Sequence, residues 1–383
     1  MKTIAFNTPT CADNELQNLQ EVMRSGRWGG GGPWAQRCLK RMTQTFGLQT
    51  AQGLLTHSCT ASLELCALLL ELNAGDEVIM PSFTFPSTAN AVALRRAVPV
   101  FVDIRQDTLN IDETRIEAAI TPRTRAIIVV HYAGVCCEMD TINHLAQHYK
   151  LRVIEDAAQA YLSRYHGRPA GFLGDMSAFS FHETKNLSCG EGGAFFCKSS
   201  EDFRRAEILC EKGTNRHEFL RGEVDRYTWR DIGSTFLLSD IHAAVLDAQI
   251  QQANAITQRR LQLWQCYHQA LAPLEFQGLI RRPIIPPHVE SNGHIYYLIL
   301  NSSELRDRLM QELRNHHINC PFHFIPLHSA PAGIRHTRTA GALPQTEDLP
   351  YRLLRLPLHQ QLLENDIQRV TDTITACLSH WAS

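Results

Sequence analysis

Short apolar runs alternate with stretches of helical period along the first 245 residues. The apolar and β-branched runs predict strands at 78–80, 98–104, 126–132, 152–155, 178–181 and 194–197. The periodic stretches predict helices at 13–24, 60–72, 86–95, 113–120, 138–149 and 201–211. Strands and helices in regular alternation predict an α/β fold, in which a mostly parallel sheet carries helices on both faces.

The remainder of the chain has a different pattern. Residues 239–272 contain no glycine or proline and predict one long helix that leads to a smaller α/β domain. That domain would contain a strand at 294–300, a helix at 302–315 and a final helix after Glu364. The segment 326–350 is rich in Pro, Gly and Ala and predicts a long loop. We therefore expect a large domain over residues 1–245 and a small C-terminal domain over residues 246–383.

Composition narrows the class of protein. The chain has 383 residues, 44% of them hydrophobic and 20% charged, so it can bury the cores of two domains. A net charge of −2 argues against general nucleic-acid binding. The twelve cysteines show no C-x-x-C spacing, which favours reduced thiols in the cytoplasm. The first residues lack the apolar core of a signal peptide, and no apolar run approaches the length of a membrane span.

A carboxylate and a lysine each follow a predicted strand. Asp156 comes after the apolar run 151–154, and Lys185 lies between the run that ends at Phe181 and a glycine loop at 190–193. In parallel sheets, ligands bind at the carboxyl ends of the strands. A lone lysine is more often solvated, and an Asp after a strand often caps the next helix. Together the two residues favour a pyridoxal phosphate site, because that cofactor needs an amine for its aldehyde and a carboxylate for its ring nitrogen.

Other residues could complete such a site. The hydroxyl of Ser180 and the helix start at His57–Ser62 could hold a phosphate, although an N-cap alone explains the helix start about equally well. Gln159, three residues after Asp156 on a predicted helix, could donate to the ring hydroxyl. Phe83 and Phe85 are core candidates, and one of them could stack on the ring.

Three other sequence features could suggest a metal site, a nucleotide site or a diphosphate site. The histidine pairs lack zinc-ligand spacing, so we expect no metal site. The four glycines at 29–32 predict a loop and not a nucleotide fingerprint. Basic and acidic residues interleave over 211–231, which predicts a solvated face, with contacts from selected basic residues to a diphosphate as the alternative.

Six segments carry a resemblance that covers essentially the whole chain. They read SGRWGGGGP, GDEVIMPSFTFPSTANA, HYAGVCCEMDTI, VIEDAAQA, FSFHETKN with GEGG, and HFIPLH. The chain resembles the sugar aminotransferases of fold type I, which aminate keto sugars on nucleotide carriers. The resemblance implies a mostly parallel seven-stranded sheet, a smaller C-terminal α/β domain, pyridoxal 5′-phosphate as cofactor, and a homodimer with shared active sites.

The resemblance also implies roles for individual residues. Lys185 would bind the cofactor's aldehyde, Asp156 its ring nitrogen and Gln159 its ring oxygen, while Phe85 would stack on the ring. Its phosphate would be held by Thr60, Ala61 and Ser180. Many relatives place an Asn of a G-x-N-x-R motif at the neighbouring subunit's phosphate. This chain has Gly233–Leu237 there, which makes Ser234 or Thr235 the candidate substitute. The candidates for the sugar substrate, chosen by resemblance and charge, are Lys212, Arg216 and His323.

The sequence of residues 212–240 resembles the corresponding segment of family members that aminate dTDP-4-keto-6-deoxyglucose from L-glutamate. This resemblance implies a part in surface polysaccharide biosynthesis. A 3-keto or UDP-linked sugar substrate is an alternative, as is a non-catalytic protein that only binds the cofactor. Related sugar dehydratases carry histidine in place of the lysine, so the presence of Lys185 favours amination. The sequence identifies no arginine for the donor's carboxylate.

Overall fold

The computed structural model describes residues 2–48 and 52–382. Its centre is a large sheet with the strand order β1-β9-β8-β5-β4-β2-β3-β13. In that order the strands are β1 (Gln52–Thr56), β9 (Gly193–Cys197), β8 (Met176–Ser180), β5 (Arg152–Asp156), β4 (Thr124–Val130), β2 (Glu77–Pro81), β3 (Val98–Val102) and β13 (Arg338–Thr339). The strands from β8 to β13 pair in parallel, and β9 runs antiparallel to both of its neighbours. The mostly parallel α/β sheet is thus confirmed.

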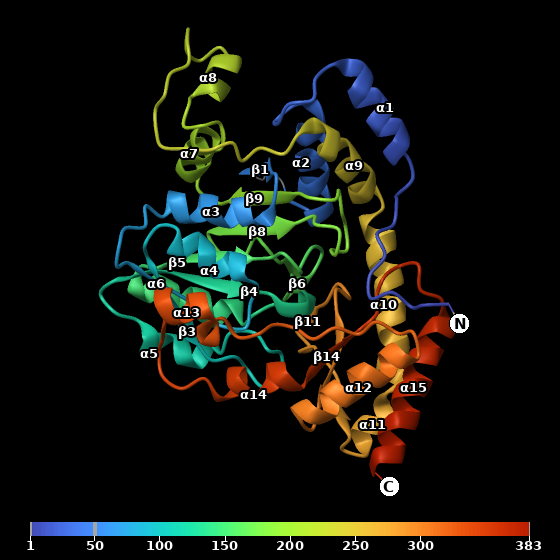
Figure 1. Ribbon diagram of the computed structural model, residues 1–383. Coiled ribbons are helices and arrows are strands. Elements are labelled where there is room, and N and C mark those ends of the chain that lie inside the picture. Colours follow the sequence, from blue (N-terminus) through green and yellow to red (C-terminus); the bar gives the residue numbers. More distant parts are fainter. Residues whose placement is uncertain (1, 49–51, 383) are drawn as a thin grey trace.

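Helices cover both faces of this sheet (Figure 1). One face packs on α1 (Glu15–Ser25), α2 (Pro33–Phe46), α5 (Ile116–Ala119), α6 (Met139–Tyr149) and α9 (Asp240–Gln251). The other face packs on α3 (Cys59–Leu69), α4 (Pro86–Ala93) and α7 (Ser200–Cys210). Side chains of one strand alternate between the two cores, as Ile79 and Met80 do on β2. Burial on both faces explains why these strands read as continuous apolar runs.

The C-terminal part has its own core. An antiparallel sheet of β10 (Ile280–Arg281), β12 (Tyr296–Leu300) and β14 (Leu353–Leu356) packs against helices, and Figure 1 shows α12 and α15 gathered beside α10. These helices are α10 (Ala253–Ala270), α11 (Ala272–Phe276), α12 (Ser303–Asn315) and α15 (Glu364–Ala382). The N-terminal segment joins this part, since Ile4 bridges to Ile318. The expected boundary at 245/246 falls inside α9 and stays a prediction.

Short elements complete the described chain. A third sheet consists of β11 (Val289–Glu290), β6 (Arg164–Tyr165) and β7 (Arg168–Pro169). The remaining helices are α8 (Arg216–Leu220), α13 (Pro331–His336), α14 (Pro344–Arg352) and the 3₁₀ turns η1 (Glu113–Arg115), η2 (Tyr132–Gly134) and η3 (Leu327–Ser329). Among residues 2–48 and 52–382, no helix combines the length and apolar character needed to traverse a bilayer.

Three details of the sequence-based prediction were wrong. The helix over 239–272 is interrupted at Gln252, whose backbone leaves helical geometry with φ −101° and ψ 7°. The segment 326–350 is no loop, because prolines at the first turn start both α13 and α14. The large sheet has an eighth strand, since β13 from this same segment adds to β3 in parallel.

Glu77 ties that eighth strand to the sheet. Its buried carboxylate accepts hydrogen bonds from Arg338 Nη2 at 2.7 Å, from Arg123 Nη2 at 2.7 Å and from Thr121 Oγ1 at 2.7 Å. Burial alone would raise the pKa of Glu77, but these donors outweigh it and lower the pKa to about 2. The network lies at the first residue of β2, at the opposite end of the strand from the carboxyl edge.

Candidate active site

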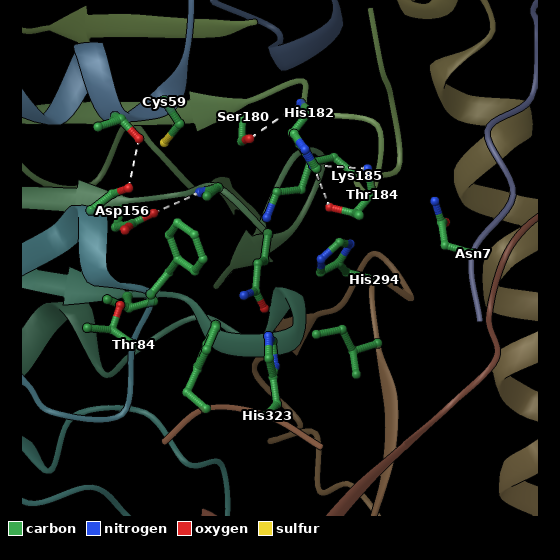
Figure 2. A pocket seen from close by; sticks show the side chains of 18 of the residues that line it. Asn7, Cys59, Thr84, Asp156, Ser180, His182, Thr184, Lys185, His294 and His323 are labelled. Atoms are coloured by element: carbon green, nitrogen blue, oxygen red, sulfur yellow. Dashed lines mark hydrogen bonds between the residues drawn. The ribbon is translucent and has the colours of Figure 1, made fainter. Parts of the chain in front are cut away.

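A pocket of about 700 Å³ lies at the carboxyl edge of the large sheet. Its lining includes seven of the residues that the sequence singles out, namely Thr60, Phe85, Asp156, Gln159, Ser180, Lys185 and His323. Figure 2 shows Asp156 and Ser180 reaching the pocket from strands of the large sheet, whereas His294 and His323 reach it from the C-terminal part. The lysine and the carboxylate therefore share one cavity, as the cofactor hypothesis requires.

Asp156 is the last residue of β5, and its carboxylate is buried. Thr88 Oγ1 donates to Asp156 Oδ2 at 2.8 Å, and the Ala158 amide donates to Oδ1 at 3.2 Å. Burial nevertheless raises the pKa of Asp156, because it outweighs these hydrogen bonds and the charge of Lys185. No helix follows this strand, so the alternative of a helix cap is wrong. A protonated ring nitrogen would supply the missing positive charge.

Lys185 follows β8 through a turn in which its amide donates to the His182 carbonyl at 2.9 Å. The described residues offer its Nζ no hydrogen bond or ion pair, and burial lowers its pKa below the ordinary value for lysine. A neutral amine is the nucleophilic form of lysine. The next residue, Asn186, holds this turn in place, because its side chain bonds to His294 Nδ1 at 2.8 Å and to the Asn292 carbonyl at 3.0 Å.

The neighbour of Asp156 on β5, Glu155, anchors the strand from the other side of the sheet. Its buried carboxylate accepts from the amides of Gly171, Leu173 and Gly174 at 2.6–2.7 Å and from His131 Nε2 at 2.8 Å. The Cys137 amide donates to His131 Nδ1, so the ring proton lies on Nε2 and points at the carboxylate. This network fixes the end of the strand that carries Asp156.

Gln159 lies in a turn, so its predicted place on a helix is wrong. Its Oε1 accepts from the Ala133 amide at 2.7 Å, which fixes the side-chain orientation. The side-chain NH₂ makes no hydrogen bond within the described chain and belongs to a pocket-lining residue. This amide therefore keeps free donors, and its bond to a ring hydroxyl stays a prediction.

The start of α3 supplies hydroxyl groups to the pocket. Thr60 Oγ1 and Ser87 Oγ lie 2.7 Å apart, and Ser180 lines the same pocket. Ser58 caps the helix by accepting from the Ala61 amide at 3.1 Å. The amide of Ala61 is occupied by this bond, and Ala61 itself is buried and does not line the pocket, which argues against its predicted contact with the phosphate. Thr60, Ser87 and Ser180 are thus the stronger candidates for a phosphate.

The two phenylalanines have different positions. Phe83 is a core residue with 1% of its surface exposed, whereas Phe85 is 60% exposed and lines the pocket, where its ring could stack on a flat cofactor. His323 also lines the pocket and contacts Tyr132 Oη through Nδ1 at 3.1 Å. Burial lowers the pKa of His323, so its ring is neutral and suited to hydrogen bonding with a sugar hydroxyl.

Besides Ala61, the predicted residues Lys212, Arg216 and Thr235 lie outside the pocket, as does Ser234. Lys212 and Arg216 both pair with Glu211, at 2.8 and 3.4 Å, near the start of α8. Thr235 is exposed and bridges to the same Glu211. None of the three lines the pocket of its own chain.

The sequence-based prediction missed Thr88, Arg260, His294 and Arg355, of which the last three line the pocket. Thr88 gave no local signal, because its bond to Asp156 spans 68 positions. Arg355 did give one, since it interrupts the apolar run Leu353–Leu358. A charged residue within a buried strand is a candidate for function, because charges are costly to bury.

Pyridoxal phosphate fits the residues present. It supplies an aldehyde that combines with an amine and a protonated ring that withdraws electrons from the substrate. Lys185 offers the unpaired amine, Asp156 the uncompensated carboxylate, Gln159 a free amide and Phe85 an exposed ring. Thr60, Ser87 and Ser180 offer hydroxyls for its phosphate. No group of three or more potential metal ligands occurs in the described ranges.

Comparisons with known proteins agree with this chemistry. A model of the DegT/DnrJ/EryC1/StrS aminotransferase family matches residues 9–375. The uncharacterized protein MJ1066 of Methanocaldococcus jannaschii is 35% identical over 379 residues, which cover 97% of this chain and 96% of that protein.

Solved structures share the whole architecture. The aminotransferase TlmJ from Streptoalloteichus hindustanus matches with a TM-score of 0.91 at 29% identity, covering 99% of this chain and 100% of that one. Spr1654 from Streptococcus pneumoniae, solved in its PLP form, has a TM-score of 0.89 at 26% identity, with 99% of each chain covered. DesI, solved with its TDP-sugar product, has a TM-score of 0.88 at 28% identity, covering 99% of this chain and 94% of that one.

The fold is therefore that of the type I aminotransferases, and the protein is a pyridoxal 5′-phosphate-dependent enzyme. Asp156 ends β5 and Lys185 follows the adjacent strand β8 through a turn, so that both line one pocket and offer the carboxylate and the amine that this chemistry requires. The chain belongs to the DegT/DnrJ/EryC1/StrS aminotransferase family.

Proposed function

We propose that the protein transfers the amino group of L-glutamate to a nucleotide-linked keto-deoxy sugar. The first choice of acceptor is dTDP-4-keto-6-deoxy-D-glucose, which would give dTDP-4-amino-4,6-dideoxy-D-galactose for surface polysaccharides. The observation that carries the proposal is the shared pocket of Lys185 and Asp156, which at about 700 Å³ has room for a cofactor and a substrate together. The similarity to DesI, which was solved with a TDP-sugar product, supports a nucleotide-sugar substrate.

The residues divide the work of such a transfer. Lys185 would act at Nζ as general base and acid, taking a proton from the donor's α-carbon and returning one to the new amino sugar. Asp156 would keep the ring nitrogen protonated, and Thr88 would hold the carboxylate in place through its 2.8 Å hydrogen bond. His323 would hydrogen-bond to the sugar.

We further propose a homodimer whose pockets are completed by the partner. Large apolar side chains are exposed on the segments that flank Thr235, with Trp229 at 78% and Ile232 at 67% exposure. Trp28 is also exposed, and its carbonyl accepts from the Asp240 amide close to the same segments. Burial of these side chains in a dimer would bring Lys212, Arg216 and Thr235 to a second pocket. Size-exclusion chromatography with light scattering tests this, and a monomer would contradict it.

The cysteines support a reducing compartment. All twelve are free, and most are buried. We therefore place the enzyme in the cytoplasm.

Three measurements test the proposed function in sequence. The purified protein should bind pyridoxal phosphate, and borohydride should trap it on Lys185. Glutamate should then convert the bound cofactor to its pyridoxamine form, which is followed by absorbance. A panel of 3-keto and 4-keto dTDP and UDP sugars, with products identified by NMR, should finally give one amino sugar.

The outcomes separate the alternatives. Absence of a trapped adduct would refute the enzyme assignment. Cofactor binding without conversion by glutamate or any other amino acid would favour the non-catalytic protein. Amination of a 3-keto or UDP-linked sugar alone would replace the proposed acceptor.

A further inference from the structure

Arg355 is a pocket-lining cation without a counter-ion. It lies on β14, in the small sheet, and lines the same pocket as Lys185. No aspartate or glutamate of the described chain forms an ion pair with it. The acids that line the pocket are Asp156, which is set to bind the ring nitrogen, and Glu191, which lies 3.6 Å from His182. The positive charge of Arg355 is therefore unbalanced by the protein.

The guanidinium is held in one orientation. Its Nε and Nη2 donate to the Phe322 carbonyl at 3.2 and 3.1 Å, and its plane lies over the Phe6 ring, with Cζ 4.5 Å from the ring centroid. Nη1 makes no hydrogen bond within the described chain, so the group keeps free donors. A fixed guanidinium with free donors is suited to a carboxylate or a phosphate, which accept two parallel hydrogen bonds.

A second arginine adds to the positive character of this wall. Arg260 is 4% exposed and donates to the carbonyls of Gly293 and His294, and no carboxylate of residues 2–48 and 52–382 pairs with it. Burial, followed by the charges of Arg355 and Lys185, lowers the pKa of His323. The pocket lining therefore carries two arginines without a carboxylate partner in the described chain, a combination that favours the binding of an anion.

We infer that Arg355 binds a carboxylate of the amino donor. This rests on the proposed function, in which an amino acid must place its amine at Lys185. Arg355 and Lys185 line the same pocket, so an anion bound by Arg355 shares that pocket with the amine. The α-carboxylate of an amino acid is two bonds from its amine, whereas the diphosphate of a 4-keto nucleotide sugar lies across the sugar ring from its keto carbon. The donor therefore fits this position better than the nucleotide.

The test uses the holoenzyme and only the first half of the reaction, so no sugar is needed. We would mix Arg355→Gln with glutamate and follow conversion of the cofactor to its pyridoxamine form. Loss of a charge-assisted hydrogen-bonding partner should raise the KM for glutamate by about ten- to a hundredfold, with the limiting rate much less affected. Arg355→Lys should recover part of this loss.

The matched control is Arg352→Gln. Arg352 lies three positions away, pairs with Asp348 and lines no part of the pocket, so its removal changes the net charge equally. It should leave the KM for glutamate unchanged. Retained cofactor absorbance and melting temperature would show that Arg355→Gln is folded. If Arg355→Gln fails to fold, Arg355→Lys and Arg355→Met would take its place.

A second readout needs no turnover. Glutarate, a dicarboxylate without an amine, should bind the wild-type holoenzyme in calorimetry more tightly than it binds Arg355→Gln. An unchanged KM for glutamate together with weaker binding of the nucleotide sugar would overturn the inference in favour of the diphosphate. A wild-type protein that no amino acid converts would refute the proposed function, whereas wild-type conversion with an unaffected Arg355→Gln refutes only the role of Arg355.

Discussion

The carboxylate of Glu77 offers a stability test that is independent of the active site. Replacement by Gln keeps the size of the side chain but removes the charge that binds Arg338, Arg123 and Thr121. A pKa that falls from the ordinary 4.5 to about 2 corresponds to about 3 kcal/mol of differential stabilisation. Water competes for the 65% exposed side chain of Arg123, so we expect Glu77→Gln to lower the free energy of unfolding by about 2 kcal/mol at pH 7.

The pH dependence gives the sign of the effect. A carboxyl with a lowered pKa in the folded state contributes stability that is fully present above its unfolded pKa, near 4.5, and is lost as the pH falls toward about 2. Urea unfolding of the wild type and of Glu77→Gln should therefore give curves that converge over this range. The measurement compares the two midpoints at several pH values from 3 to 7.

The control is Glu290→Gln, since Glu290 is exposed and its carboxylate makes no hydrogen bond or ion pair in the described structure. It should change the free energy of unfolding by less than about 0.5 kcal/mol. A Glu77→Gln variant as stable as this control, or a difference that stays constant between pH 7 and pH 3, would refute the reasoning. Activity per folded molecule should be unchanged, because Glu77 lies at the opposite end of β2 from the pocket.

The other predictions concern the site and the start of α2. Thr88→Val removes the hydroxyl that donates to Asp156, so the pKa of Asp156 should rise further, and the acid limb of the pH–rate profile for glutamate should move up by about one to two units; an unmoved profile contradicts this. Asp156→Asn should keep the fold by circular dichroism but slow the glutamate half-reaction by about a hundredfold or more, and near-normal turnover would argue against its role. Gly32→Ala would place a Cβ 2.2 Å from Asp240 Oδ2, displace the carboxylate that accepts the first amides of α2, and cost about 1–3 kcal/mol in thermal or urea unfolding. Gly29→Ala, where a Cβ meets nothing within 4 Å, is its control, and equal losses in both variants would exclude the steric cause.

The parts of the fold that the sequence predicts are those with a local signal. Buried strands give apolar runs, and Asp156 and Lys185 each follow one such run. No glycine or proline marks the break at Gln252 between α9 and α10, so the sequence does not predict it. The segment 326–350 was taken for a loop because proline occurs both in loops and at helix starts.

The active site, too, contains residues with a local sequence signal and residues without one. Charge and resemblance pointed to Lys212 and Arg216, yet both pair with Glu211 in their own chain. Arg355 reaches the pocket only through the docking of the small sheet against the large one, 170 positions after Lys185 in sequence. Contacts between residues so far apart depend on tertiary structure, and one sequence does not encode them in any local pattern.

The pocket draws its two kinds of residue from different stretches of the chain. The amine, the carboxylate and the hydroxyls proposed to bind the phosphate precede residue 190, whereas Arg260, His294, His323 and Arg355 come after residue 250. Substitutions after residue 250 can therefore change which amino acids and sugars the enzyme accepts, while the residues proposed to bind the vitamin B6 coenzyme stay the same. Such a separation allows proteins that descend from one ancestor to make different products by the same reaction.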